Sequence, residues 1–151
     1  MSQGSLFAQK RTAASSAITA NIDGGARGNP GPAAYGVVIR NGQGVVLAEL
    51  AEYLGHQTNN VAEYSGLLAA LDYAVREKHA SLKVVSDSEL LVRQMKGIYK
   101  VSSPALKDLY AKAQTAVRKL DRFSIEHVLR EKNREADRLV NKVLDERGRQ
   151  R

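Results

Sequence analysis

Hydrophobic and polar residues alternate along the first part of the chain. The alternation over residues 18–23 has a period of two, which is typical of a strand. A second strand is predicted at 35–40, a tight hairpin at Asn41-Gly42, and a third strand at 45–53. Since short hairpins join antiparallel neighbours, the chain is expected to begin with three antiparallel strands.

The hydrophobic period then changes to that of helices. Hydrophobic residues recur at helical spacing over 64–75, after the helix-start signal Thr58-Asn59-Asn60. The remaining expected elements are a strand at 82–86, a helix at 89–96 that ends before Gly97, a helix that opens at Ser103-Pro104, a strand at 123–129 and a helix that begins near Asn133. The order βββαβααβα predicts an α/β fold. Its mixed five-stranded sheet would have three antiparallel strands, then two parallel ones, and helices on both faces.

The length of 151 residues suits one domain with its own core. We expect a flexible, polar tail at 1–16, the domain at 17–146 and a basic tail at 147–151. The absence of cysteine excludes disulfides and thiolate zinc sites. No hydrophobic run reaches the length of a membrane span or resembles a signal peptide, so a cytoplasmic monomer without membrane contact is the expectation.

The net charge of +7 is unevenly distributed. Residues 93–122 hold eight basic and two acidic side chains, a net charge of +6, whereas residues 12–91 hold five basic and eight acidic ones, a net charge of −3. A basic region beside an acidic one is expected where metal-binding carboxylates lie next to a bound polyanion. Ordinary solvated helix faces explain the same charges equally well.

Four acidic residues fall at predicted strand ends or helix starts, and each has a structural explanation of its own. Asp23 could start an Asx-turn, Glu63 could complete a capping box with Asn60, Asp87 could cap a helix, and Asp137 could favour a helix dipole. The four together favour a shared site, because parallel pairing of the first and fourth strands would bring Asp23 and Asp87 to one crevice.

A cluster of carboxylates suits hard divalent cations, which take oxygen ligands. Hydrolysis of a phosphodiester needs an activated water and stabilisation of the leaving oxygen, and two Mg²⁺ ions serve both needs. The sequence therefore favours a two-metal site at Asp23, Glu63, Asp87 and Asp137, with Mn²⁺ as a substitute for Mg²⁺.

Four motifs in order resemble the ribonuclease H type 1 family, in a compact form. They are DGGARGNPGP at 23–32, TNNVAEY at 58–64, VSDSE at 85–89 and REKNREAD at 130–137. The resemblance implies the RNase H-like fold and an endonuclease that cleaves the RNA strand of RNA/DNA hybrids, leaving 3′-hydroxyl and 5′-phosphate ends. It also implies that the catalytic residues and metal ligands are Asp23, Glu63, Asp87 and Asp137.

Substrate contacts are expected at small and polar residues beside these acids. The set is Gly24, Gly25, Ala26, Asn29, Thr58, Asn59 and Glu89. Glycine lets backbone approach a ribose 2′-hydroxyl, and the family resemblance assigns a minor-groove base contact to Asn59 and a DNA phosphate to Asn29 and Thr58. Helix capping by Thr58 and turn formation around Asn29 are the structural alternatives, and the role of Glu89 stays open.

The chain departs from many family members at two places. The loop at 128–133 lacks the histidine that many members carry there, and Arg130 or Glu131 are the available substitutes. Some members insert a basic protrusion between the second and third helices, where this chain has only residues 97–103. The compact layout resembles a branch in which some members also cleave double-stranded RNA, which makes that duplex a second substrate to test.

Two other classes of protein remain as alternatives. A binding module with the same fold would bind hybrids or double-stranded RNA without cutting them. A DNA junction resolvase or integrase-like nuclease would share the acids but not the Gly24-Gly25 and Thr58-Asn59-Asn60 features, which favour hybrid recognition.

Overall fold

The computed structural model describes residues 17–150 and gives the predicted order of elements. The strands are β1 (Ala17–Ala26), β2 (Gly31–Asn41), β3 (Val46–Gln57), β4 (Ser81–Ser86) and β5 (Arg122–His127). The helices are α2 (Asn59–Arg76), α3 (Glu89–Met95), α4 (Pro104–Val117) and α5 (Arg134–Arg149), with a 3-10 turn, η1 (Arg130–Lys132), before α5. The tail predicted at 1–16 lies outside the described residues.

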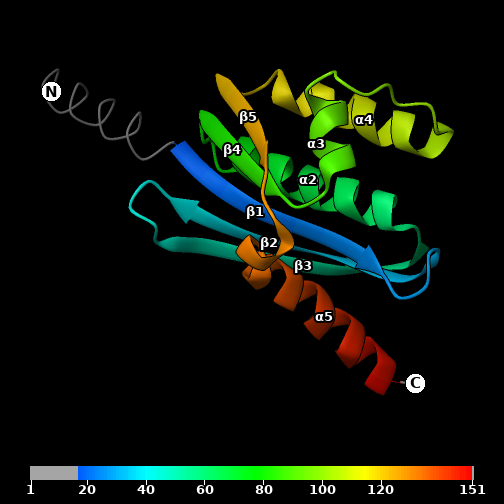
Figure 1. Ribbon diagram of the computed structural model, residues 1–151. Helices are drawn as coiled ribbons and strands as arrows, with labels where there is room; N and C mark the ends of the chain where they lie inside the picture. The colour runs from blue at the N-terminus through cyan, green and yellow to red at the C-terminus, as the bar shows by residue number, and fades with distance from the viewer. Residues whose placement is uncertain (1–16, 151) are drawn as a thin grey trace, which may run out of the picture.

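The five strands form one mixed sheet in the order β3-β2-β1-β4-β5 (Figure 1). β2 pairs antiparallel with β1 and β3, and β4 pairs parallel with β1 and β5. The predicted fold class is therefore confirmed. In the β1–β4 register Ile22 lies opposite Ser86. Asp23 follows Ile22 and Asp87 follows Ser86, so the two acids lie at the same end of the two central strands.

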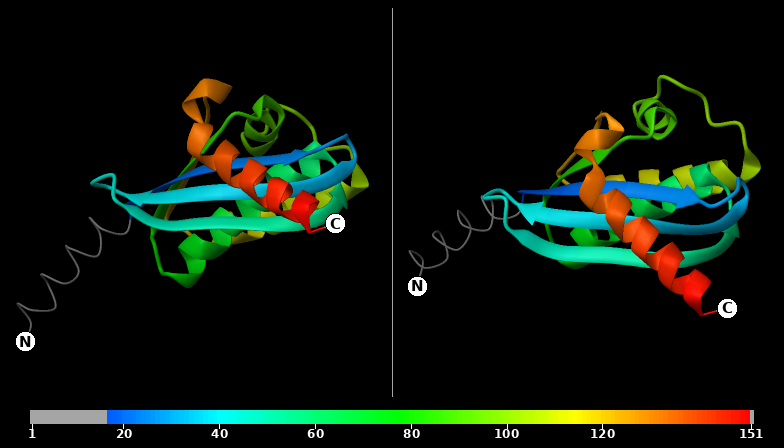
Figure 2. Two further views of the ribbon diagram at one scale, coloured as in Figure 1. Left: turned by 90° about the horizontal axis from the view of Figure 1, so that it is seen from below. Right: turned by 60° about the horizontal axis from the view of Figure 1, so that its bottom comes forward.

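Helices cover both faces of the sheet, as predicted. α5 lies across one face and α2 lies on the other, with α4 packed on α2 (Figure 2). The main core joins the inward side chains of the central strands to α2, α3 and α4, and Ile22, Tyr64 and Leu67 are among its fully buried members. α5 packs through a smaller, separate cluster of Ala34, Val140 and Leu144. The site described below lies where these layers meet.

Several elements extend beyond their predicted bounds. The first strand was expected to end at residue 23, where a glycine-rich turn would begin, but β1 continues to Ala26, which pairs with Ala33 of β2. Only residues 27–30 connect the two strands. At the other end of the chain, α5 continues to Arg149, into the basic tail expected at 147–151.

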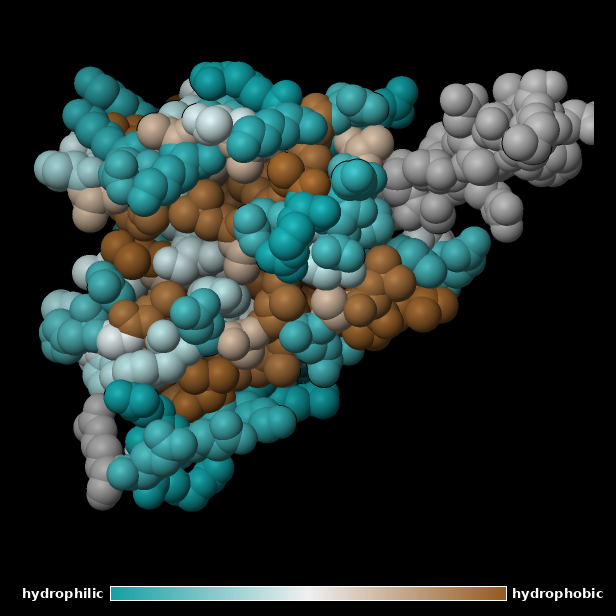
Figure 3. Space-filling view, turned by 180° about the vertical axis from the view of Figure 1, so that it is seen from behind, coloured by the Kyte–Doolittle hydropathy of each residue, from teal (hydrophilic) through white to brown (hydrophobic). Residues whose placement is uncertain are grey.

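The β2–β3 hairpin exposes hydrophobic side chains. Val45, Val46 and Leu47 are 55%, 44% and 41% exposed. Hydrophobic residues gather at this end of the molecule, near the start of β1 (Figure 3). Among residues 17–150, no helix is long and hydrophobic enough to cross a membrane.

Candidate active site

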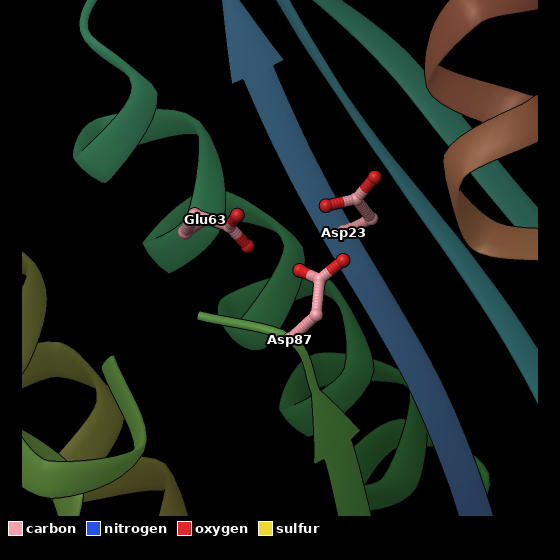
Figure 4. A group of neighbouring side chains, drawn as sticks. All are labelled: Asp23, Glu63 and Asp87. Carbon is pink, nitrogen blue, oxygen red and sulfur yellow. The ribbon is translucent and has the colours of Figure 1, made fainter. Parts of the chain in front are cut away.

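Three carboxylates point toward one another at the end of the central strands (Figure 4). One oxygen from each of Asp23, Glu63 and Asp87 lies within 4.8 Å of the other two. Asp23 stands on β1, Glu63 on the second turn of α2, and Asp87 directly after β4. The parallel β1–β4 pairing and the packing of α2 on β1 therefore produce the cluster.

The fourth predicted acid, Asp137, lies in the same pocket. This pocket, of about 490 Å³, is lined by all four acids together with Arg130 and Asn141. Asp137 stands outside the group of three and is partly exposed; its Oδ1 is 3.8 Å from Arg130 Nη2. Asn141 Nδ2 donates to Asp137 Oδ2 at 3.4 Å. The structure thus brings the predicted acids together, three closely and one at the α5 wall.

Burial and mutual repulsion raise the pKa values of Asp23, Glu63 and Asp87, so these acids do not all ionise together. Burial, with Asp87 and Asp137 nearby, raises the pKa of Asp23 to about 8. Burial and the neighbouring Asp23 hold the pKa of Glu63 well above its usual range. Burial raises the pKa of Asp87, an effect that the Arg130 guanidinium opposes. A site of this kind retains protons, which a bound cation would displace.

The structural explanations for Glu63 and Asp87 are wrong. Thr58, not Asn60, caps α2 and accepts a hydrogen bond from Val61 N at 3.2 Å, so Glu63 belongs to no capping box. The cap of α3 is Ser88 and not Asp87; its Oγ accepts from Leu91 N at 3.2 Å. These two acids are therefore left free for another role.

The structure contradicts the Asx-turn explanation for Asp23 but agrees with the helix-dipole explanation for Asp137. Asp23 lies within a regular strand and starts no turn. Asp137 does stand in the first turn of α5, where a carboxylate is favoured by the helix dipole.

Glu63 carries an unsatisfied buried atom. Its Oε2 is buried and has no hydrogen-bond partner among the described residues. A buried carboxylate oxygen without a partner is costly. Because all the donors here are carboxylate oxygens, the residues present fit a hard divalent cation such as Mg²⁺. Asp23, Glu63 and Asp87 are the residues that would hold it.

The glycines beside Asp23 differ in their surroundings. A Cβ on Gly24 would lie 2.3 Å from the carbonyl carbon of Ala62, so this glycine lets α2 approach β1. A Cβ on Gly25 would meet nothing closer than 4.0 Å, and Gly25 and Ala26 line the pocket. Close packing of α2 thus accounts for Gly24 within the protein, although Gly24 lines the pocket together with Gly25 and Ala26.

The predicted polar contacts form a network at the start of α2. Asn59 Oδ1 accepts from Ala26 N at 2.8 Å, and Asn29 Oδ1 accepts from Asn59 N at 3.0 Å. With Thr58 as the cap, these contacts fix the β1–β2 connection to α2. Of these residues, Asn59 and Ala26 line the pocket.

The remaining predicted contact, Glu89, lies away from the pocket. It forms an ion pair with Arg93 at 2.8 Å, one turn later on α3. Together with Lys96 and His127 it lines a separate surface hollow. The structure therefore does not bring Glu89 to the carboxylates.

Sequence reasoning missed the importance of Asn133. Its buried side chain donates to the carbonyl of Ile22 at 2.7 Å and accepts from Asn21 Nδ2 at 3.1 Å. These bonds fasten the start of α5, and with it Asp137, to the strand that carries Asp23. An asparagine before a helix indicates a cap, yet this side chain makes no cap hydrogen bond, so no pattern in the sequence pointed to the contact.

Comparison with known proteins assigns the family. The family model "Reverse transcriptase-like" matches residues 21–143. The bifunctional protein Rv2228c of Mycobacterium tuberculosis is 46% identical over 129 residues, which are 85% of this chain and 35% of that protein. The chain thus spans about a third of the length of that relative.

Solved structures agree with this assignment. RNase H1 of Halobacterium salinarum superimposes with a TM-score of 0.82 at 39% identity, over 85% of this chain and 98% of that one. LC11-RNase H1, solved in complex with an RNA/DNA hybrid, has a TM-score of 0.80 at 44% identity, over 85% and 97%. With the five-stranded sheet and the converging acids, these similarities show that the chain belongs to the ribonuclease H type 1 family.

Proposed function

We propose that this chain is a metal-dependent endoribonuclease that hydrolyses the RNA strand of RNA/DNA hybrids and leaves 3′-hydroxyl and 5′-phosphate ends. The observation that carries the proposal is the Asp23–Glu63–Asp87 cluster, with its unsatisfied buried Glu63 oxygen, in an open pocket. Removal of R-loops and of replication primers is the cellular task that suits this reaction.

The four acids have distinct places in the proposed reaction. Asp23, Glu63 and Asp87 would hold the divalent ions, with Asp23 the most central of them, and Asp137 would contribute from α5. The chemistry that two Mg²⁺ ions supply in such a site is activation of a water and stabilisation of the leaving oxygen. Arg130, on the rim beside Asp137, stands where a loop histidine is missing and offers a cation to a phosphate.

Recognition of the hybrid uses surfaces on either side of the acids. Gly25 and Ala26 leave room for a ribose, and Asn59 adds a polar side chain to the same pocket. Thr58 and Asn29 lie next to it, where a DNA-strand phosphate would bind. Glu89 pairs with Arg93 outside this pocket, and its contact with the hybrid stays a prediction.

The basic region at 93–122 supplies a second surface. A hollow between the α3–α4 connection and α4 is lined by Tyr99, Lys100, Lys107 and Tyr110. Tyr99 is 43% exposed, and the Arg93 guanidinium lies 5.3 Å from its ring centroid. Exposed aromatic rings beside cations are typical of nucleic-acid contacts, so this hollow replaces the missing protrusion.

One assay tests the proposal against its alternatives. Labelled RNA/DNA hybrid, double-stranded RNA and branched DNA are incubated side by side with Mg²⁺, Mn²⁺ or EDTA. We expect metal-dependent cleavage of the RNA strand in the hybrid, and the double-stranded RNA arm decides whether that duplex is a second substrate. Cleavage of branched DNA alone would indicate a resolvase, and binding of hybrid without cleavage a binding module.

The pKa of Asp23 predicts that metal-free protein loses stability as pH rises. Its pKa is about 8 in the folded state, against 3.8 for an ordinary aspartate, so between pH 5 and pH 7 the folded state holds a proton that the unfolded state has released. One such proton lowers the free energy of unfolding by about 2–3 kcal/mol over this range. Urea unfolding in EDTA at the two pH values measures the loss.

Two comparisons check the cause of this pH dependence. Asp23→Asn removes one titrating group and should lessen the dependence, to which Glu63 still contributes, whereas Asp72→Asn, on the exposed side of α2, should leave it as it is. Mg²⁺ should restore stability at pH 7 in the wild type. An equally steep loss in the wild type and in Asp23→Asn contradicts the assignment.

A further inference from the structure

The solvent side of α5 carries cations at regular spacing. Arg134, Arg138 and Lys142 stand four residues apart, and all three are exposed. Four residues advance an α-helix by about 6 Å and turn it by only about 40°. The three side chains therefore form one row about 12 Å long, here named the α5 cation row.

This row differs from the charged faces of the other helices. Those faces carry opposite charges four residues apart, in the pairs Asp72–Arg76 on α2, Glu89–Arg93 on α3 and Asp108–Lys112 on α4. The α5 cation row places like charges at that spacing, which is unfavourable for an isolated helix. Within residues 17–150 no member of the row forms an ion pair.

The acids of α5 are mostly engaged elsewhere. Glu135 binds Arg40 on β2, with an Oε1–Nη2 distance of 2.8 Å, and Asp145 binds Arg27 at 2.7 Å. Asp137 lies in the pocket, and Glu146 follows the row one turn after Lys142. The row is thus a local strip of positive charge, and the one acid that continues it is Glu146, at its C-terminal end.

The row borders the pocket of the four acids. Asp137 and Asn141 on α5 line that pocket, and each is followed directly by a member of the row. Figure 2 shows α5 lying across the sheet with its outer side open to solvent. Because the clustered carboxylates repel a polyanion, cations beside the pocket are needed to attract one.

We propose that the α5 cation row binds the phosphate backbone of the strand that is being cleaved, on one side of the scissile bond. This inference rests on the proposed function. The cleaved strand is the chosen partner because its phosphate must enter the pocket whose wall is α5. A row about 12 Å long matches three to four nucleotides of one strand along a duplex axis.

Extended substrates test the proposal. The set is a core hybrid, and the same hybrid with about six extra nucleotides on the 5′ or the 3′ end of the RNA or of the DNA strand. Dissociation constants are measured by fluorescence anisotropy in EDTA for three proteins: the wild type, Arg138→Gln/Lys142→Gln and the control Lys78→Gln/Lys83→Gln. The control removes the same charge from exposed residues away from the pocket, before and within β4.

We expect the wild type to bind one RNA-extended hybrid about tenfold more tightly than the core. The row variant should lose most of this preference and should show a salt slope for the extended hybrid smaller by about 1.4. The control should keep both. An equal preference in the two variants, or a preference for a DNA extension that the row variant loses, overturns the proposal.

The two levels of the proposal fail in different ways. If the wild type does not cleave the core hybrid with Mg²⁺ or Mn²⁺, the proposed function fails. If it cleaves the hybrid but the row variant keeps the preference for extended RNA, only the role of the α5 cation row fails.

Discussion

Asp23→Asn is expected to lower the rate of hybrid cleavage by about a thousandfold or more, while the protein stays folded. Asp23 is 7% exposed and has Asp87 and Asp137 as neighbours, so its charge is central to any bound cation. Losing about 4 kcal/mol of transition-state stabilisation corresponds to a thousandfold decrease in rate. Single-turnover cleavage of a labelled hybrid, at saturating enzyme with Mg²⁺ or Mn²⁺, measures the effect.

The same variant should unfold at a higher temperature than the wild type in EDTA at pH 8, because one of several crowded acids is removed. A higher unfolding temperature together with a lower cleavage rate would show that the variant has lost a catalytic group and not its fold. Asp72→Asn, which makes the same chemical change on exposed α2 surface, should retain activity. Full activity of Asp23→Asn with either metal would show that the proposed mechanism is wrong.

Gly24→Ala is expected to lower the free energy of unfolding by at least about 3 kcal/mol. The added methyl group would lie 2.3 Å from Ala62 C and 2.5 Å from Glu63 N, and backbone atoms cannot rotate away as a side chain can. α2 would have to move off β1, and Glu63 would move with it. Urea unfolding with Mg²⁺ present measures the loss of stability.

The neighbouring glycine provides a matched control. Gly25→Ala makes the same change one residue later in β1, where the new atom would meet nothing closer than 4.0 Å. Its stability should change by less than about 1 kcal/mol. Similar losses at both positions would mean that the close approach of α2 does not explain Gly24.

Periodicity and local start signals were sufficient to predict the fold. The caps at Thr58 and Ser103 and the stop at Gly97 were readable because each depends on residues adjacent in sequence. Residues 24–26 were misassigned because glycine usually marks a turn, whereas here it permits helix packing and strand pairing. That reason lies in α2, far along the chain.

The candidate site was predictable only in part. The meeting of Asp23 and Asp87 followed from one inferred parallel pairing, which the structure confirms. Local rules offered capping roles to Glu63 and Asp87, and only the backbone geometry shows that Thr58 and Ser88 take those roles. The bond from Asn133 to Ile22 joins residues 111 positions apart and has no local signal.

The separate packing of α5 has a consequence for how the molecule opens. The small Ala34–Val140–Leu144 cluster, the Asn133 bonds and two exposed ion pairs to Glu135 and Asp145 hold this helix, whereas α2, α3 and α4 share the main core. Elements with few buried contacts exchange their amide hydrogens through local opening, at a lower free energy than global unfolding. A local opening of α5 would therefore leave the main core intact, and it would remove Asp137 from the site while Asp23, Glu63 and Asp87 stay assembled.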